Sequence, residues 1–237
     1  MLGRFLELSV PAPRILDSWH FYQRLGFSSA TVGEIWAHRY AVVSDGRIAL
    51  GLHDIELEGP TLSYVLPDLG QRIAALEAAG IEFDSRVLGN EAFNEARFAT
   101  PAGQHARLIE ARTFSPPEHP KPSVLGWFEE YALPTIELAE SRRYWEALGF
   151  VTVTEATTPW PQLSLTSDSL NIGLYNTREL KAPALVFSLE DLAPLRARLD
   201  ELGLEPSTNL PRSLDPASHL MLIAPEGTQL LVGPPDG

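Results

Sequence analysis

The sequence of 237 residues carries a formal net charge of −13 at pH 7 and contains no cysteine. This charge would repel phosphate polymers, so we expect no nucleic-acid partner, whereas a cationic small molecule would be favoured; acidity that serves only solubility is the alternative. Without cysteine there is no disulfide and no thiolate chemistry, and no apolar run approaches the roughly 20 residues of a membrane span, so we expect a cytoplasmic protein with no membrane partner.

The first elements along the chain are a strand and a helix. Apolar residues alternate with other residues over residues 5–10, which is the period of a strand with two different faces. From Arg14 onward apolar residues recur at helical spacing, and Gly26 follows as a C-terminal stop. Short β-rich runs between Phe27 and Leu52 complete a predicted β-α-β-β-β unit.

This unit is repeated along the chain. A second strand ends at Leu66-Pro67, and the helix that follows it ends at Gly80. Shifting the sequence by 123 residues then places residues 5–11 on residues 128–134, and Leu25-Gly26-Phe27 on Leu148-Gly149-Phe150. A repeat of this length indicates a duplicated domain, and the chain reads as four units of about 55 residues.

The domain boundaries follow from the repeat and from a proline-rich segment. We predict a first domain over residues 1–113 and a second over residues 125–237. Residues 114–124 between them contain four closely spaced prolines, which favour an extended and stiff linker.

Three segments together resemble the vicinal oxygen chelate superfamily, which includes glyoxalases, extradiol dioxygenases and bleomycin-resistance proteins. They are the leading strand, the helix ending Phe21-Tyr22-Gln23-Arg24-Leu25-Gly26-Phe27, and the closing Thr100-Pro101-Ala102-Gly103-Gln104-His105, repeated as Ala224-Pro225-Glu226-Gly227-Thr228-Gln229. The resemblance implies an α+β fold of two tandem glyoxalase-like domains, each with two βαβββ units that form a curved sheet around a cavity. Because the superfamily hosts many chemistries, it implies less about function.

In members that use a metal, the resemblance implies His, Glu or Gln ligands on three strands that face the cavity. The alignment places six other residues there: Phe5, Thr61 and Arg107 in the first copy, then Phe128, Ala184 and Leu231 in the second. Phenylalanine, alanine and leucine cannot coordinate a metal, and arginine brings its own positive charge. We therefore predict no metal and no cofactor at the usual position of either copy.

A displaced metal site is the alternative. Glu7 and His105 each lie two residues from an expected ligand position, on the same strand face if the period of two holds, and His53 ends the fourth strand. These three side chains could form a hard-to-borderline site. The second copy has Tyr175 and Gln229 in place of the two histidines, so such a site would be confined to the first copy.

Glu7 and its repeat Glu130 are the candidate catalytic bases, because both are placed mid-strand on the predicted cavity face. A buried carboxylate is costly unless it is paired or neutralised. In the first copy we predict that Arg107 pairs with Glu7 where a metal would otherwise lie, with or without a ligand. In the second copy Glu130 could face a cationic ligand, act as a base or lie solvated at the cavity rim.

Aromatic residues complete the predicted cavities. Trp36 and Trp160 occupy similar places after the first helix of each copy, and Phe5, Phe128 and Tyr175 are expected to line the interior. Such walls suit a planar or apolar ligand held by stacking. Ordinary packing inside a curved sheet would give the same pattern.

We interpret the sequence as that of a metal-independent binding protein of the glyoxalase/bleomycin-resistance type, with a planar or cationic ligand. The alternative is an enzyme of the same superfamily, a lyase, isomerase or dioxygenase that uses displaced metal ligands or a glutamate base. The duplicated halves can satisfy each other's interfaces within one chain, which favours a monomer. The predicted ligand-binding residues are Phe5, Glu7, Trp36, His53, His105, Arg107, Phe128, Glu130, Trp160 and Tyr175.

Overall fold

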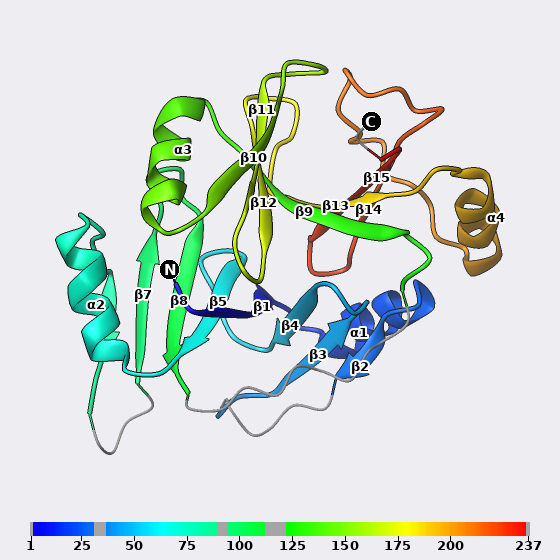
Figure 1. Ribbon diagram of the computed structural model, residues 1–237. Coiled ribbons are helices and arrows are strands. Elements are labelled where there is room, and N and C mark those ends of the chain that lie inside the picture. The colour runs from blue at the N-terminus through cyan, green and yellow to red at the C-terminus, as the bar shows by residue number, and fades with distance from the viewer. Residues whose placement is uncertain (1, 31–36, 90–93, 112–121, 236–237) are drawn as a thin grey trace.

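The computed structural model describes residues 2–30, 37–89, 94–111 and 122–235. These residues form two twisted sheets with helices packed against them (Figure 1). The predicted ligand-binding residue Trp36 and most of the predicted linker, residues 114–121, lie outside the described residues.

The first sheet is built from two consecutive βαβββ units. Its strands lie in the order β2-β3-β4-β1-β5-β8-β7-β6. The first unit comprises β1 (Arg4–Pro11), α1 (Ile15–Arg24), β2 (Ser28–Ala30), β3 (Tyr40–Ser44) and β4 (Ala49–His53). The second comprises β5 (Thr61–Leu66), α2 (Leu69–Ala78), β6 (Ser85–Val87), β7 (Glu95–Ala99) and β8 (His105–Glu110).

The second sheet repeats this plan with one strand fewer. Its order is β10-β11-β12-β9-β13-β15-β14. The third unit comprises β9 (Trp127–Pro134), α3 (Leu138–Ala147), β10 (Val151–Ala156), β11 (Gln162–Thr166) and β12 (Asn171–Tyr175). The last comprises β13 (Ala184–Ser188), α4 (Ala193–Leu202), β14 (Leu220–Ile223) and β15 (Gln229–Gly233), with turns in place of the missing strand.

The pairing directions repeat as well as the strand order. In the first sheet β1 runs antiparallel to β5 and parallel to β4, and β5 runs parallel to β8. In the second sheet β9, β13, β12 and β15 are paired in the same directions. The predicted fold class, tandem βαβββ pairs that form two curved sheets, is thereby confirmed. The exact domain boundaries stay a prediction.

One hydrophobic core joins the two sheets. Its buried members come from the four helices and from the face of each sheet that the helices cover. Phe27 and Phe187 meet edge to face across the halves, with ring centroids 6.4 Å apart. The helices end, as predicted, at Gly26 (φ +90°) and Gly149 (φ +99°). These turns and the aromatic packing direct the chain from each helix back to its sheet.

The two halves also contact each other through equivalent elements. α1 reaches the turn between β14 and β15, where the Tyr22 hydroxyl donates a hydrogen bond of 2.6 Å to Glu226 Oε1. α3 in turn lies over the ends of β7 and β8 (Figure 1). The described part of the chain contains no helix of the length and apolarity that a membrane crossing needs.

Candidate functional site

A β-bulge in β1 decides which side chains enter the core and which lie on the opposite face of the first sheet. Phe5 pairs with Tyr64 and Glu7 pairs with Ser63, so the residue between them has no partner on β5. The bulge turns Phe5 and Glu7 to opposite faces although they are two residues apart. Phe5 packs edge to face on Tyr64 in the core, 5.5 Å between ring centroids.

The same bulge occurs in β9 of the second sheet. Phe128 pairs with Phe187, whereas Glu130 pairs with Val186, and the register shifts between them. Phe128 accordingly lies in the core against Phe187, with ring centroids 5.6 Å apart. The prediction that Phe5 and Phe128 line the cavities is wrong, because the bulge breaks the two-residue period on which it depended.

In the first sheet Glu7 is enclosed by hydrogen-bonding partners. Its Oε1 lies 2.8 Å from Nε2 of His53 and accepts a hydrogen bond of 2.8 Å from the Ser9 hydroxyl. Ser9 in turn lies 2.8 Å from the hydroxyl of Ser63. The absence of a side chain at Gly51 leaves the room that the Glu7 carboxylate occupies. Glu7 and His53 are fully buried and paired with each other, a pairing that the sequence did not predict.

His38 and Tyr40 extend this network and were missed in the sequence. Nε2 of His38 lies 2.8 Å from Nδ1 of His53, and the Tyr40 ring stacks on His53 with centroids 5.6 Å apart. Burial, followed by His53 and Arg107, lowers the pKa of His38. The strand period could have indicated both residues, because Tyr40 pairs with His53 across the β3–β4 hairpin and His38 lies two residues earlier.

Arg107 faces Glu95 of the neighbouring strand β7. Its guanidinium is buried, and its Nε lies 3.7 Å from Glu95 Oε2. Burial and the positive charge of Arg97, which is directly opposite on β7, lower the pKa of Arg107, while Glu95 and then Glu7 raise it. The predicted direct pair with Glu7 is therefore wrong: Glu7 bonds His53 and Ser9, and it acts on Arg107 only at longer range.

His105 lies apart from Glu7 and His53. It is half-buried near the sheet rim, with Nε2 3.7 Å from Glu58. Within residues 2–30, 37–89, 94–111 and 122–235, no three His, Asp or Glu side chains are grouped closely enough to hold a metal ion. The alternative site of Glu7, His53 and His105 is contradicted, because His105 is directed towards Glu58 instead.

The strand register also corrects which residues stand at the expected metal-ligand positions, which form one row across three neighbouring strands. In the first sheet Glu7, Ser63 and Arg107 lie side by side, so the residue that β5 contributes to this row is Ser63 and not Thr61. In the second sheet the equivalent row is Glu130, Val186 and Leu231, with Val186 in place of Ala184. Each row offers one carboxylate and no histidine, with a serine and an arginine beside it in the first sheet and a valine and a leucine in the second. These residues do not fit the metal that the fold family implies.

The second sheet encloses a cavity of about 450 Å³ on the face opposite the helices. Glu130 forms part of its wall and is only 6% exposed. Gly173 on β12 makes room for this carboxylate, as Gly51 does for Glu7. None of the described residues that line the cavity is a lysine or an arginine. The cavity thus combines a buried carboxylate with aromatic and apolar walls.

Trp160 and Tyr175 form the aromatic wall of this cavity, as the sequence predicted. Their ring centroids are 6.0 Å apart and the rings are inclined at 47°. The indole N–H of Trp160 is buried and, among the described residues, has no hydrogen-bond acceptor. Gln162 pairs with Tyr175 as Tyr40 pairs with His53, so Gln162 is the equivalent of Tyr40. Trp160, two residues before Gln162, therefore corresponds to His38 and not to Trp36.

His219 lines the same cavity and was not predicted. Its ring lies against Gly233, where a side chain would collide with it. Nδ1 lies 3.3 Å from the carbonyl oxygen of Asp215 and 3.0 Å from the Ser218 hydroxyl. A proton on Nδ1 suits the carbonyl acceptor, which leaves Nε2 as an acceptor. The sequence gives no sign of this placement, because the turns before β14 carry it.

Known structures share this architecture. A catechol 2,3-dioxygenase matches 98% of this chain and 87% of its own, with a TM-score of 0.64 and 14% identity. The 2,3-dioxygenase LapB from Pseudomonas sp. KL28 matches 99% and 92%, with a TM-score of 0.63 and 18% identity. Homoprotocatechuate 2,3-dioxygenase from Brevibacterium fuscum, as its E323L mutant, matches 99% and 72%, with a TM-score of 0.62 and 13% identity.

No family model matches the sequence, and no curated protein shows significant sequence similarity to it. At identities this low the structural similarity establishes the fold alone. The predicted resemblance to the vicinal oxygen chelate superfamily is confirmed at that level, and the neighbours are its extradiol dioxygenases.

Proposed function

We propose that this chain binds a small organic molecule in the cavity of the second sheet, without a metal. The observation that carries the proposal is a cavity of about 450 Å³ whose wall combines the carboxylate of Glu130 with the rings of Trp160 and Tyr175. A buried carboxylate attracts a positive or strongly hydrogen-bonding group much more in such surroundings than in water. A cationic ligand therefore complements this cavity.

The other walls support a flat ligand with an acceptor group. Trp160 and Tyr175 present aromatic surface, on which a planar molecule can stack. The buried indole N–H of Trp160 gains a partner if the ligand places an oxygen or nitrogen acceptor near it. Nε2 of His219 can accept a hydrogen bond from the ligand. The ligand class is thus a planar molecule with a cationic group and at least one acceptor.

The comparison between the two sheets favours the second as the binding site. In the first sheet Arg107 and Arg97 pair across β7 and β8 and fill the equivalent region with charge. In the second sheet Leu231 and Met221 pair at the equivalent position. Apolar side chains therefore stand beside Glu130, which lines the cavity, whereas Glu7 is enclosed by His53 and Ser9.

A binding assay with a matched set of flat aromatic compounds tests this proposal. Cationic, neutral and anionic members of one scaffold should bind in that order of affinity. Glu130→Gln should weaken the cationic member about tenfold, equivalent to roughly 1.4 kcal/mol, because it removes the charge but keeps the shape. Glu7→Gln is the matched control, since it changes the equivalent carboxylate of the first sheet.

Two outcomes of this assay would refute the proposal. One is equal affinity for the cationic and neutral compounds. The other is an unchanged affinity of the Glu130→Gln variant for the cationic compound. Trp160→Phe provides an independent readout, because it should weaken only those compounds that carry an acceptor able to reach the indole N–H.

Ring-cleaving dioxygenase activity is the second candidate, because dioxygenase structures match 98–99% of this chain. That chemistry would need a metal, and neither the Glu7–Ser63–Arg107 row nor the Glu130–Val186–Leu231 row supplies a ligand set for one. Elemental analysis of the purified protein, and catechol turnover after incubation with Fe²⁺ or Mn²⁺, decide between the candidates. About one metal per chain that is lost in Glu130→Gln or Glu7→Gln would favour the dioxygenase.

A further inference from the structure

The two halves of the chain form two equivalent niches at their interface. In one, Tyr22 of α1 faces the turn that precedes Gly227; in the other, Trp145 of α3 faces the turn that precedes Gly103. Tyr22 and Trp145 are equivalent by the repeat of 123 residues. Each packs edge to face on the phenylalanine after its helix, with ring centroids 5.2 Å and 5.0 Å apart.

The two turns have the same backbone but different side chains. In each, the glycine N–H donates to the carbonyl oxygen three residues earlier, at 2.8 Å. Glu226 precedes the glycine in one turn and Ala102 precedes it in the other. The residue at this position therefore decides what fills each niche.

The niche at α1 is closed by its own side chains. Tyr22 is fully buried, and its hydroxyl donates to Glu226 Oε1 at 2.6 Å. Burial, followed by the charge of Glu226, raises the pKa of Tyr22 well above its usual value. The Tyr–Glu pair thus occupies the space between the helix and the turn.

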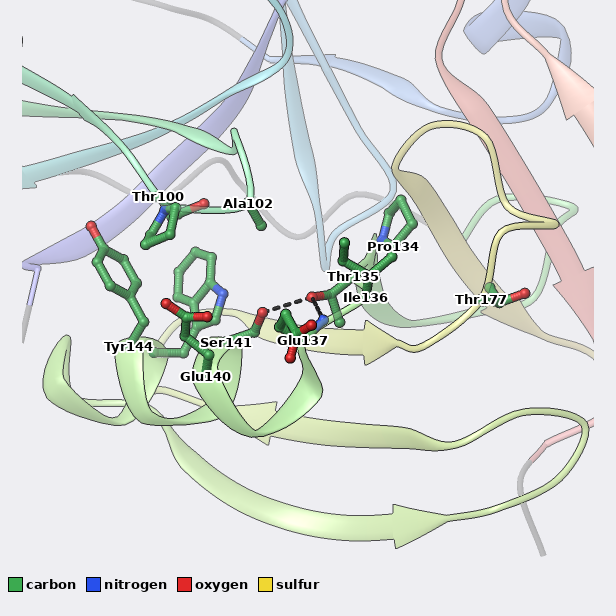
Figure 2. Close-up of a pocket in the computed structure, with 12 residues that line it drawn as sticks. Thr100, Ala102, Pro134, Thr135, Ile136, Glu137, Glu140, Ser141, Tyr144 and Thr177 are labelled. Atoms are coloured by element: carbon green, nitrogen blue, oxygen red, sulfur yellow. Dashed lines mark hydrogen bonds between the residues drawn. The ribbon is translucent and has the colours of Figure 1, made fainter.

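The niche at α3 is open. Ala102 has only a methyl group and Trp145 has no hydroxyl, and a cavity of about 420 Å³ lies between their elements (Figure 2). Figure 2 shows Glu140, Ser141 and Tyr144 projecting from α3 towards the turn that carries Thr100 and Ala102. The chain therefore keeps a hollow where the equivalent niche is filled.

The lining of this hollow is acidic and aromatic. Glu137 and Glu140 stand at its edge, the half-buried Tyr144 contributes aromatic surface beside the buried Trp145, and no described lining residue is a lysine or an arginine. Burial, with a contribution from Asp84, raises the pKa of Tyr144 to about 12, so its ring is a neutral phenol at neutral pH. Aromatic faces next to carboxylates form a favourable environment for an organic cation.

An adjoining smaller hollow of about 230 Å³ limits where a cation can lie. It shares Trp145 with the first and is lined by Lys181, whose ammonium donates to the carbonyl oxygen of Arg178 at 2.7 Å. A positive ligand is therefore favoured at the end formed by Glu137, Glu140 and Tyr144. We propose that this interdomain cavity is a second binding site, which takes a small organic ammonium ion.

The test uses benzyltrimethylammonium as the probe and its neutral isostere, in which carbon replaces nitrogen, as the comparison. Binding to the whole chain is followed by NMR through the indole N–H signal of Trp145, which the Trp145→Phe variant assigns. The cation should shift this signal in a saturable manner, and the neutral compound should bind at least several-fold more weakly. The experiment is repeated in Glu130→Gln, which alters the cavity of the second sheet and should leave the Trp145 response unchanged.

Two variants test the geometry. Trp145→Tyr with Ala102→Glu rebuilds the pair that closes the α1 niche; the probe should then no longer bind there, as judged by the Tyr144 ring signals. Glu140→Gln should weaken the cation about fivefold, the upper range for a solvent-exposed ion pair, whereas Glu205→Gln on an exposed segment should have no effect.

The proposal is overturned if the Trp145 signal does not respond to the cation, or if the neutral isostere binds equally well. It is also overturned if the rebuilt Tyr–Glu pair leaves binding unchanged in a protein with a native-like spectrum. A response that disappears in Glu130→Gln would assign the cation to the other cavity and would likewise refute a separate interdomain site.

Discussion

Single residues show how the two copies have diverged around one repeated carboxylate. Glu7 is held by a histidine and a serine inside a charged network, whereas Glu130 lies in the wall of a cavity with aromatic and apolar neighbours. A buried carboxylate is stabilised by hydrogen bonds or by a positive charge. In the first copy His53 and Ser9 bond Glu7, and in the second we propose that a ligand in the cavity contacts Glu130.

Arg107 offers a test of the pairing in the first sheet. Arg107→Leu should lower the free energy of unfolding by about 3 kcal/mol, because it removes a buried cation next to Glu95 and within range of Glu7. Adding Glu95→Gln should recover part of this loss, and adding Glu7→Gln should recover less. Denaturant midpoints measure both cycles, and the reverse order of recovery would show that Glu7 is the main partner after all.

His38 predicts a pH dependence of stability. Its pKa in the folded protein is lowered, chiefly by burial and then by His53 and Arg107, while Asp54 and Glu7 act in the opposite direction. The unfolded chain, with a histidine pKa of about 6.5, therefore binds the proton more readily. His38 therefore contributes fully to the free energy of unfolding above about pH 6.5, the pKa of the unfolded histidine. This contribution is lost as the pH falls from there through the lower pKa of the folded protein.

The corresponding measurement compares denaturant midpoints at pH 7.5 and pH 5.5. His38→Gln should reduce the loss of stability between the two, and His20→Gln, which changes an exposed histidine on α1, should not. An identical pH dependence in the His38 variant and the unaltered protein would contradict this assignment.

At the level of elements, a repeated bulge and a repeated glycine together place each glutamate. The bulges in β1 and β9 turn Glu7 and Glu130 to the cavity face while the preceding phenylalanines enter the core. Gly51 and Gly173 on the adjacent strands then leave space for the carboxylates. Neither feature alone would suffice, because a rotated carboxylate without that space would collide with the neighbouring strand.

Gly51→Ala tests this arrangement, because its new methyl group would overlap the carboxylate of Glu7. We expect a loss of about 2 kcal/mol, in the range for overpacking a buried position. Thermal or denaturant unfolding measures it, with Gly89→Ala as the control, since nothing lies within 4 Å of a side chain there. In a Glu7→Ala background the same change should cost much less; an equal cost would show that the collision is not with Glu7.

In the whole molecule, the shared core makes the two halves interdependent. Buried residues from both sheets and all four helices belong to one cluster, and hydrogen bonds such as that from Phe5 N–H to Ser169 Oγ, at 2.9 Å, join the halves. Interfaces of this kind are satisfied within one chain, which is consistent with the predicted monomer. That state, like the cytoplasmic location, stays a prediction.

Unfolding should therefore be one cooperative event. Calorimetry should show a single transition whose calorimetric and van't Hoff enthalpies agree. Tyr22→Phe should shift it to lower temperature, by about 1–2 kcal/mol in stability, because it leaves the Glu226 carboxylate without its hydrogen-bond donor. Two separate transitions, of which only one moves in the variant, would show that the halves fold independently.

The sequence by itself determined the plan of this protein and only part of its site. The repeat, the strand and helix periods and the glycine stops are local signals, so they predicted the tandem βαβββ fold and indicated Glu7, Glu130, Trp160 and Tyr175 as candidate site residues. These predictions depend on neighbours along the chain, where the periods of strand and helix hold.

Only the tertiary structure decided which of these side chains meet. The bulge sends Phe5 into the core, the register sets Arg107 opposite Arg97 and within 3.7 Å of Glu95, and the turns before β14 bring His219 to the cavity. The hollow at Trp145 depends on contact between halves that are distant in sequence. Such features arise from a one-residue shift in register and from packing between separate elements, and neither leaves a periodic signal in the sequence.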